Sequence, residues 1–146
     1  MEMGGAGMQR IGNRGSFEGE FHFPGDKSIT HRAIMLNGGA GGESIISNAL
    51  MGEDCISTCN CMRALGAQID VDGTTLRVKG TLQFRRGTEL NCGNSGTTIR
   101  LLTGYVAGKN VDAMLYGDQS LSSRPMKRVA EPLALLGANV KTTDGH

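Results

Sequence analysis

Residues 90–101 read Leu-Asn-Cys-Gly-Asn-Ser-Gly-Thr-Thr-Ile-Arg-Leu, with small and hydroxyl side chains at an expected helix start and Arg100 one turn later. Glycines let a ligand approach the backbone closely, and the free N–H groups of a first helical turn attract anions. The stretch therefore indicates a cradle for a phosphate or a carboxylate. An ordinary capped helix start with a solvated arginine is the alternative interpretation.

A second stretch of the same character lies 68 residues upstream. Residues 23–32 read Phe-Pro-Gly-Asp-Lys-Ser-Ile-Thr-His-Arg, and the Ser, Thr and Arg at 28, 30 and 32 are spaced as the Gly, Thr and Arg at 96, 98 and 100. Another similar pair, Ala-Leu-Gly-Ala-Gln-Ile at 64–69 and Leu-Leu-Gly-Ala-Asn-Val at 135–140, is separated by 71 residues. Such self-similarity indicates two copies of one structural unit.

Each unit predicts alternating helices and strands, and therefore an α/β fold. The first predicts a helix at 28–36, a strand at 44–47, a helix at 54–65, and strands at 67–71 and 75–79 joined by the hairpin signal Asp72-Gly73. The second predicts a helix at 95–106, a strand at 111–116, a helix at 125–136 and a strand at 138–141. Pro125 fits the first position of that last helix, with Ser123 or Arg124 as its cap.

The last residues of the chain bear on its completeness. Asp144-Gly145 corresponds to Asp72-Gly73, but the second unit has no counterpart of the return strand at 75–79. A strand without its neighbour exposes unpaired backbone groups. We therefore expect a fragment of a longer protein, with a complete small protein that has a frayed tail as the alternative.

Composition favours a soluble domain that handles small ligands. A length of 146 residues fits one domain, and the formal net charge of +1 with only 4% aromatic residues argues against a nucleic-acid interface. The sequence contains no apolar run long enough to cross a membrane. We expect a cytoplasmic protein without nucleic-acid or membrane partners.

The cysteines do not predict a metal site. Cys55, Cys59, Cys61 and Cys92 form no paired C-x-x-C motif, and only the histidines at 22, 31 and 146 could complete a metal site. Cys55 and Cys59 share one helical face with Met62, so we expect these side chains in the core.

Basic residues gather where helices are expected to begin. Lys27 precedes the first helix, and Arg124, Lys127 and Arg128 surround the start of the last one. A helix N-terminus is already partly positive, so exposed cations there are disfavoured by about 0.3–1 kcal/mol each. Repeated placement of this kind indicates a strongly anionic ligand, although solvated cations neutralised by nearby acids explain any single case.

Three segments together resemble the EPSP synthase family of enolpyruvyl transferases. They are Pro-Gly-Asp-Lys-Ser-Ile-Thr-His-Arg at 24–32, Gly-Asn-Ser-Gly-Thr-Thr-Ile-Arg at 93–100 and Ser-Leu-Ser-Ser-Arg-Pro-Met-Lys-Arg at 120–128. Their order and separations match the family. The resemblance runs from about Gly15 onward and covers roughly the first third of a complete enzyme, so it identifies the chain as an N-terminal part.

The resemblance implies transfer of the enolpyruvyl group of phosphoenolpyruvate to the 5-hydroxyl of shikimate-3-phosphate, with release of phosphate, in aromatic amino acid biosynthesis. It implies no metal and no organic cofactor. Two phosphates and two carboxylates must be held close together, which calls for positioning and electrostatic stabilisation. The missing C-terminal remainder of the enzyme is the expected protein partner, and the isolated chain is expected to be inactive.

Site residues follow from the matching motifs. The resemblance assigns Lys27 to both substrates and to charge stabilisation in catalysis, and Ser28 and Arg32 to shikimate-3-phosphate. It assigns phosphoenolpyruvate to the residues of the second and third motifs, Asn94, Gly96, Thr97 and Arg124, together with Lys27. Arg100 is a further candidate, either as an anion contact or as a residue that orders the loop. Thr30 and His31 are expected to shape the turn.

The family fold has two domains, each built from three βαβαββ units, with substrates bound in the cleft between them. On this template residues 1–22 are a leader and a strand from the other domain, 23–86 are one unit, and 87–146 are a second, incomplete unit. A nucleotide-sugar enolpyruvyl transferase and a noncatalytic phosphate-binding or assembly half of a split protein are the alternative functions.

Overall fold

The structure is a computed structural model and describes residues 12, 18–143 and 145. Most of the expected leader, including Phe17, lies outside the described residues. Its described part, 18–22, is irregular, and regular structure begins at Lys27. No described strand pairs with this segment, so its backbone has no hydrogen-bonding partner for an extended ladder.

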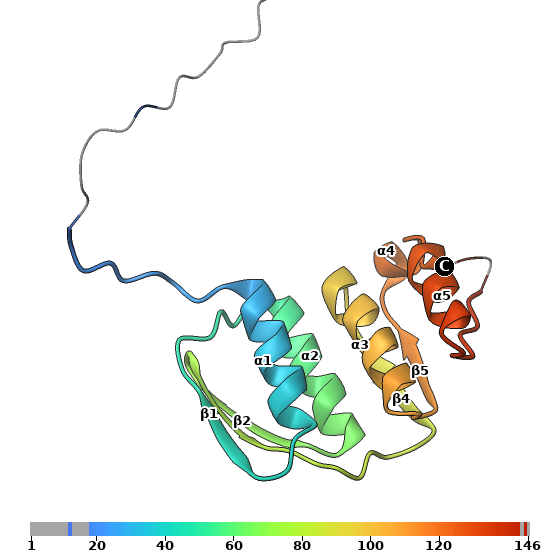
Figure 1. Cartoon of the computed structure of the whole chain (residues 1–146), viewed down its shortest axis with the longest axis horizontal. Helices are drawn as coiled ribbons and strands as arrows, with labels where there is room; N and C mark the ends of the chain where they lie inside the picture. The colour runs from blue at the N-terminus through green and yellow to red at the C-terminus, as the bar shows by residue number, and fades with distance from the viewer. Residues whose placement is uncertain (1–11, 13–17, 144, 146) are drawn as a thin grey trace, which may run out of the picture.

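Three helices, α1 (Lys27–Gly38), α2 (Glu53–Leu65) and α3 (Gly96–Gly108), lie side by side and run in the same direction (Figure 1). All three therefore begin at one end of the molecule. The helices predicted at 28–36, 54–65 and 95–106 are confirmed, with every start within one residue and every end within two residues of the prediction. Cap residues fix two of these starts, since Asp26 accepts from the amide of Ile29 and Ser95 accepts from that of Thr98.

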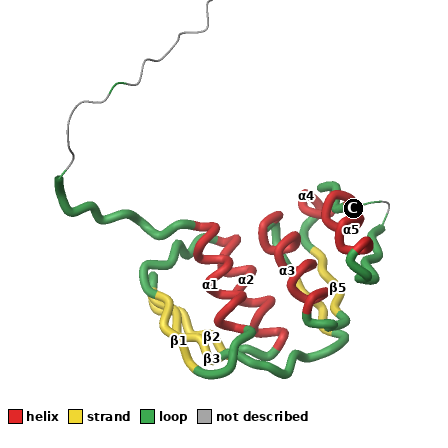
Figure 2. The backbone as a smooth tube through the Cα atoms, in the orientation of Figure 1, coloured by secondary structure: helices red, strands yellow, loops and turns green. Residues whose placement is uncertain are grey.

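One face of a three-stranded sheet packs against α1 and α2 (Figure 2). The sheet has the order β1-β3-β2 and is antiparallel throughout, with β1 (Glu43–Ile46), β2 (Gln68–Asp72) and β3 (Thr75–Lys79). Side chains alternate along the central strand, so Leu76 and Val78 are buried while Arg77 is exposed. The predicted hairpin at Asp72-Gly73 is confirmed, and Gly73 has the positive φ that the turn requires.

The second half of the chain contains a parallel strand pair. Strand β4 (Thr88–Asn91) leads into α3, which crosses over to β5 (Ala113–Tyr116). The sequence did not predict β4, and β5 starts two residues later than expected. Because both strands run toward the end where α3 begins, their carboxyl ends lie at the helix starts (Figure 1).

The last part of the chain differs from its prediction. A short helix, α4 (Gln119–Ser122), precedes α5 (Lys127–Leu135), and Met126 rather than Ser123 or Arg124 is the N-cap of α5. Pro125 therefore lies before the helix, because Asp118 caps α4 and residues 119–124 form a separate turn. The strand expected at 138–141 is absent, since no described strand lies beside this segment to pair with it.

Helix α2 forms the centre of the core. Its thiols at 55, 59 and 61, together with Met62 and Leu65, are almost completely buried, which confirms the structural interpretation of these cysteines. They pack with Ile34 of α1, Leu90 of β4 and Leu102 of α3. Because α2 contacts both neighbouring helices, it fixes the relative positions of the two helix starts that carry the predicted site.

Candidate anion-binding site

The start of α1 presents the first group of predicted residues. Asp26 caps the helix through a 2.7 Å bond from the Ile29 amide to its carboxylate, so the next side chains lie in the first turn. Lys27, Ser28 and Arg32 are all exposed there. The Arg32 guanidinium donates to the Ser28 carbonyl oxygen at 2.9 Å, which holds it along this turn. Two cations and one hydroxyl thus stand beside a helix N-terminus.

Lys27 is held by an acid from the neighbouring helix. Its Nζ lies 2.8 Å from Oδ2 of Asp54, in the first turn of α2. Hydrogen bonding to this carboxylate and its negative charge raise the pKa of Lys27 above its usual value. The ammonium is exposed, so the pair positions the side chain and keeps it protonated more than it stabilises the fold.

The start of α3 provides the second group. Ser95 accepts from the Thr98 amide at 3.1 Å, and the Ile99 amide donates to the Ser95 carbonyl oxygen. The amides of the first helical residues, Gly96 and Thr97, have no acceptor within a helix. They are the donors that an anion at this end would find.

Two guanidinium groups approach Gly96 from different segments. A Cβ atom built on Gly96 would lie 2.9 Å from Nη1 of Arg100 and 2.9 Å from Nη1 of Arg124. Arg100 also donates to the Gly96 carbonyl oxygen at 3.4 Å, whereas its buried Nε has no partner in the described part of the chain. The structure thus brings both arginines to the glycine that the sequence singled out.

Asn94 orients one of these arginines. Its amide oxygen accepts from Nη2 of Arg124, and its amide nitrogen donates to Oδ2 of Asp118 at 2.7 Å. The bond from the Leu121 amide, and then the Asn94 amide, hold the pKa of Asp118 below its usual range. Asp118 stays ionised and anchors Asn94, which in turn fixes the Arg124 guanidinium beside Gly96.

The sequence did not predict a buried row of hydroxyl groups that joins the three helix starts. Thr58 Oγ1 lies 2.7 Å from Nδ1 of His31 and 2.8 Å from Oγ1 of Thr98. Thr98 Oγ1 lies 2.7 Å from Oγ of Ser95 and 3.1 Å from the carbonyl oxygen of Asp54. The only signal for these contacts in the sequence was Thr58, a threonine among the apolar residues on one face of α2.

Lys127 and Arg128 do not join this group. Lys127 lies in the first turn of α5 and pairs with Glu131 at 3.4 Å, so a neighbouring acid accounts for it. Arg128 is exposed and forms no ion pair with another described residue. The alternative interpretation, a cation neutralised by a nearby acid, therefore applies to Lys127.

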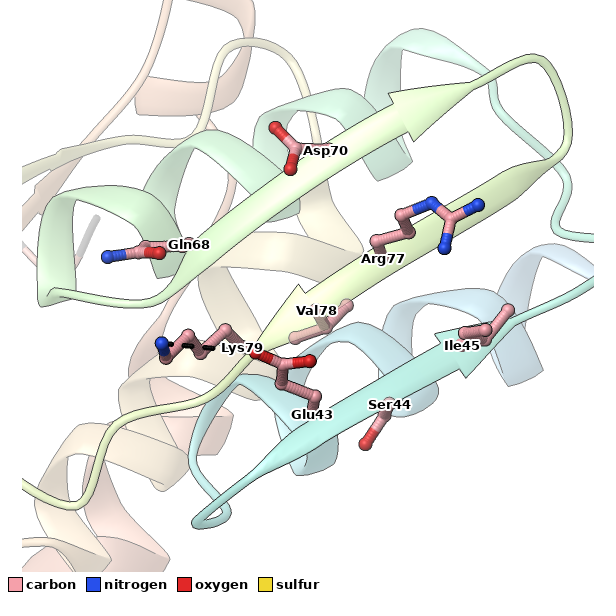
Figure 3. A pocket seen from close by; sticks show the side chains of 8 residues that line it. All are labelled: Glu43, Ser44, Ile45, Gln68, Asp70, Arg77, Val78 and Lys79. Carbon is pink, nitrogen blue, oxygen red and sulfur yellow. Dashed lines mark ion pairs between the residues drawn. The ribbon is translucent and has the colours of Figure 1, made fainter.

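A separate hollow lies on the outer face of the three-stranded sheet. Figure 3 shows acidic and basic side chains over it, including Asp70, Arg77 and the pair formed by Glu43 and Lys79, whose charged atoms are 3.9 Å apart. Charges of both signs make this face a poor anion site. Among the described residues, no three His, Cys, Asp or Glu side chains are grouped to hold a metal ion. None of the described helices has the length and apolar character to span a membrane.

Comparisons with known proteins agree on one family. The model of the family described as EPSP synthase (3-phosphoshikimate 1-carboxyvinyltransferase) matches residues 11–146. The 3-phosphoshikimate 1-carboxyvinyltransferase of Thermoanaerobacter sp. (strain X514) is 47% identical over 131 residues, which are 88% of this chain and 31% of that protein. The Geobacillus thermodenitrificans protein of the same name is 45% identical over 97% of this chain and 34% of its own length.

A solved structure of EPSP synthase from Acinetobacter baumannii has a similar fold. It aligns with a TM-score of 0.76 and 38% identity over 86% of this chain and 29% of that chain. The α/β fold class expected from the sequence is thereby confirmed. The chain spans about a third of the length of the curated relatives it matches.

Proposed function

The chain belongs to the EPSP synthase family, and from this premise we propose that it forms the N-terminal part of a 3-phosphoshikimate 1-carboxyvinyltransferase. The substrates would be shikimate-3-phosphate and phosphoenolpyruvate. The names of the relatives favour this enzyme over a nucleotide-sugar enolpyruvyl transferase. The C-terminal remainder of such an enzyme would supply the other side of the site.

The proposed reaction is an addition followed by an elimination. A proton adds to the methylene carbon of phosphoenolpyruvate, and the 5-hydroxyl of shikimate-3-phosphate attacks the adjacent carbon while losing its own proton. Loss of a methyl proton and cleavage of the carbon–oxygen bond to phosphate then release phosphate and leave the enolpyruvyl ether. No net oxidation occurs, so the proposal needs no redox cofactor, and the cationic side chains of this chain supply electrostatic stabilisation.

In this proposal, the starts of α1 and α3 bind different substrates. Ser28 and Arg32 at the start of α1 would bind the phosphate of shikimate-3-phosphate, and Lys27 would contact both substrates. Phosphoenolpyruvate would lie against the amides of Gly96 and Thr97. Its charges would be neutralised by Arg124, which Asn94 orients, and by Arg100.

One observation supports the proposal most strongly, namely the placement of Nη1 of Arg100 and Nη1 of Arg124 against the same face of Gly96. Two like charges at one glycine repel each other. An anion bound between them would relieve that repulsion, and the absent Cβ lets both guanidinium groups approach the backbone of Gly96. Lys27 joins this region through its ion pair with Asp54, whose carbonyl oxygen accepts from Thr98 of α3.

The test is reconstitution with the remainder of a relative. We expect this chain, mixed with the C-terminal remainder of the Thermoanaerobacter protein, to release phosphate from phosphoenolpyruvate only when shikimate-3-phosphate is present. Arg124→Ala in this chain should remove the activity, and Lys127→Ala is the matched control because Lys127 pairs locally with Glu131. A stable complex that binds neither substrate would contradict the enzyme and support a noncatalytic assembly module.

The proposal includes a cytoplasmic location. All four cysteines, at positions 55, 59, 61 and 92, are free and buried. Burial raises the pKa of Cys59 to about 11, so this thiol stays protonated. Free thiols are typical of a reducing compartment.

A further inference from the structure

A buried row of hydrogen-bonded side chains joins His31, Thr58 and Thr98. These three residues come from α1, α2 and α3, and each side chain is fully buried. The helices that carry them begin at Lys27, Glu53 and Gly96. A contact among the three therefore connects all the helix starts of the anion site.

The hydrogen bonds can be satisfied in one direction along the row. The Asp54 carbonyl oxygen can only accept, so the Thr98 hydroxyl, at 3.1 Å, donates to it. The Thr58 hydroxyl, which lies farther from the same carbonyl oxygen at 3.4 Å, then donates to Thr98, and Nδ1–H of His31 donates to Thr58. This assignment leaves Nε2 of His31 as a bare acceptor, which agrees with its lack of any partner among the described residues.

Two residues bonded to the row, Asp54 and Ser95, position the residues predicted to bind the ligand. Asp54 is the residue whose carboxylate binds Lys27, and Thr98 contacts Ser95, the cap of α3. Thr58 is the only member that reaches both His31 and Thr98. Removing its hydroxyl leaves Nδ1 of His31 without a partner and takes one contact from Thr98, which keeps those with Ser95 and the Asp54 carbonyl oxygen. An unpaired buried group is costly in a core.

We infer that Thr58 is a positioning residue that holds the Lys27 end of α1 and the Gly96 turn of α3 in fixed register through its buried hydroxyl. Thr58 itself touches no substrate, because its side chain is fully buried. The inference deepens the proposed function and rests on it only for the identity of the ligand. The register itself can be tested without any ligand.

The test compares substitutions in this chain. Thr58→Val replaces the hydroxyl with a methyl group of similar shape, and Thr58→Ser retains the hydroxyl. Thr103→Val is the matched control, because Thr103 is also buried but bonds only to the Ile99 carbonyl oxygen of its own helix, at 2.7 Å. Amide hydrogen exchange and ¹H–¹⁵N spectra are recorded for each variant without ligand.

We expect Thr58→Val to accelerate exchange of the Thr98 amide about tenfold and to shift the amide signals at both helix starts. Thr58→Ser should restore both readouts, and Thr103→Val should leave them unchanged at Ser95–Thr98. A folded Thr58→Val chain with wild-type exchange and shifts at 95–98 would overturn the inference. If Thr58→Val does not fold, Thr98→Ala and Thr98→Ser make the same comparison from α3, with the amides of 29–31 as the readout.

A titration with shikimate-3-phosphate separates this inference from the proposed function. Thr58→Val should weaken binding about tenfold relative to wild type, with Thr58→Ser within about twofold. Absence of wild-type binding would count against the proposed ligand and leave the ligand-free result to decide the role of Thr58. Normal binding by a Thr58→Val chain with perturbed helix starts would overturn the link between register and affinity.

Discussion

Gly96 has no side chain, and two positively charged guanidinium groups lie against it. A methyl group there would lie 2.9 Å from both Arg100 and Arg124, whose flexible ends can move aside. We predict that Gly96→Ala changes the free energy of unfolding by about 0.5 kcal/mol or less, because alanine favours helix. The same change should weaken phosphoenolpyruvate binding about tenfold in the reconstituted enzyme.

Two measurements check this prediction, namely urea unfolding of the chain and inhibition or binding constants of the reconstituted enzyme. Gly104→Ala, on the same helix with no atom within 4 Å of the added methyl group, is the matched control and should retain wild-type affinity. An equal loss of affinity in both variants would show that the space at Gly96 is not part of the site.

Because His31 is buried, we expect the stability of the folded chain to depend on pH. Burial lowers the pKa of His31, so the folded chain keeps the imidazole neutral at a pH where the unfolded chain, with a pKa near 6.5, binds a proton. The unfolded state then holds more protons, and the free energy of unfolding falls as pH falls through about 6.5. Asp54 opposes this shift, whereas Lys27 and Arg32 add to it.

We predict that His31→Asn reduces this dependence, measured by urea unfolding between about pH 7.5 and 5.5. His22→Asn serves as the control because His22 is exposed and should leave the slope unchanged. A wild-type slope in the His31→Asn variant would contradict the assignment of the dependence to this buried ring.

The sequence motifs singled out the cations and the glycine of the candidate site but not its buried hydroxyl groups. Lys27, Gly96 and Arg124 lie in motifs whose glycine and charge pattern has a direct electrostatic meaning. Thr58 stands in an ordinary amphipathic helix, and its role depends on Thr98, 40 residues later. Contacts between distant buried hydroxyls leave no periodic pattern in the sequence, so the row could not be predicted.

At the scale of single helices and strands, the N-cap residue Ser95 fixes where α3 begins. Ser95 is buried, accepts from the Thr98 amide, and has its hydroxyl oxygen 2.7 Å from that of Thr98. We predict that Ser95→Ala lowers the free energy of unfolding by about 1–2 kcal/mol, measured by urea unfolding. Ser57→Ala is the control, because Ser57 bonds only to the Glu53 carbonyl oxygen within α2, and it should cost about 0.5 kcal/mol or less. Equal losses would contradict a special role for the cap.

Helices α2 and α5 should differ in local stability. Helix α2 has six buried residues, whereas α5 has none. Its last residue, Leu135, is 90% exposed, and the following Leu136 is 83% exposed. We predict that amide hydrogen exchange is slowest in α2 and fastest in α5. Comparable protection in the two helices would show that α5 is covered in solution.

The elements that were mispredicted have short or weak local signals. Strand β4 has a single fully buried apolar residue, Leu90, within four residues, and α4 is only one turn long. The strand expected at 138–141 has a suitable pattern but no described neighbour. Strand formation depends on a pairing partner, so local pattern alone predicted it wrongly.

At the scale of the whole molecule, the chain presents one side of a proposed two-sided site. The helix starts and the carboxyl ends of β4 and β5 lie together at one end (Figure 1). We predict that the chain alone releases no phosphate from phosphoenolpyruvate and shikimate-3-phosphate, since the relatives are about three times as long. A phosphate-release assay checks this, with the reconstituted enzyme as the positive control and turnover by the chain alone as the contrary result.

A ¹H–¹⁵N titration of the chain with shikimate-3-phosphate most directly tests whether the starts of α1 and α3 form one anion site. The amides of Ser28 and Gly96 should shift on saturable curves with the same dissociation constant, and Arg32→Ala should weaken both together. Unchanged Gly96 signals on saturation of Ser28, or two different dissociation constants, would contradict a single site.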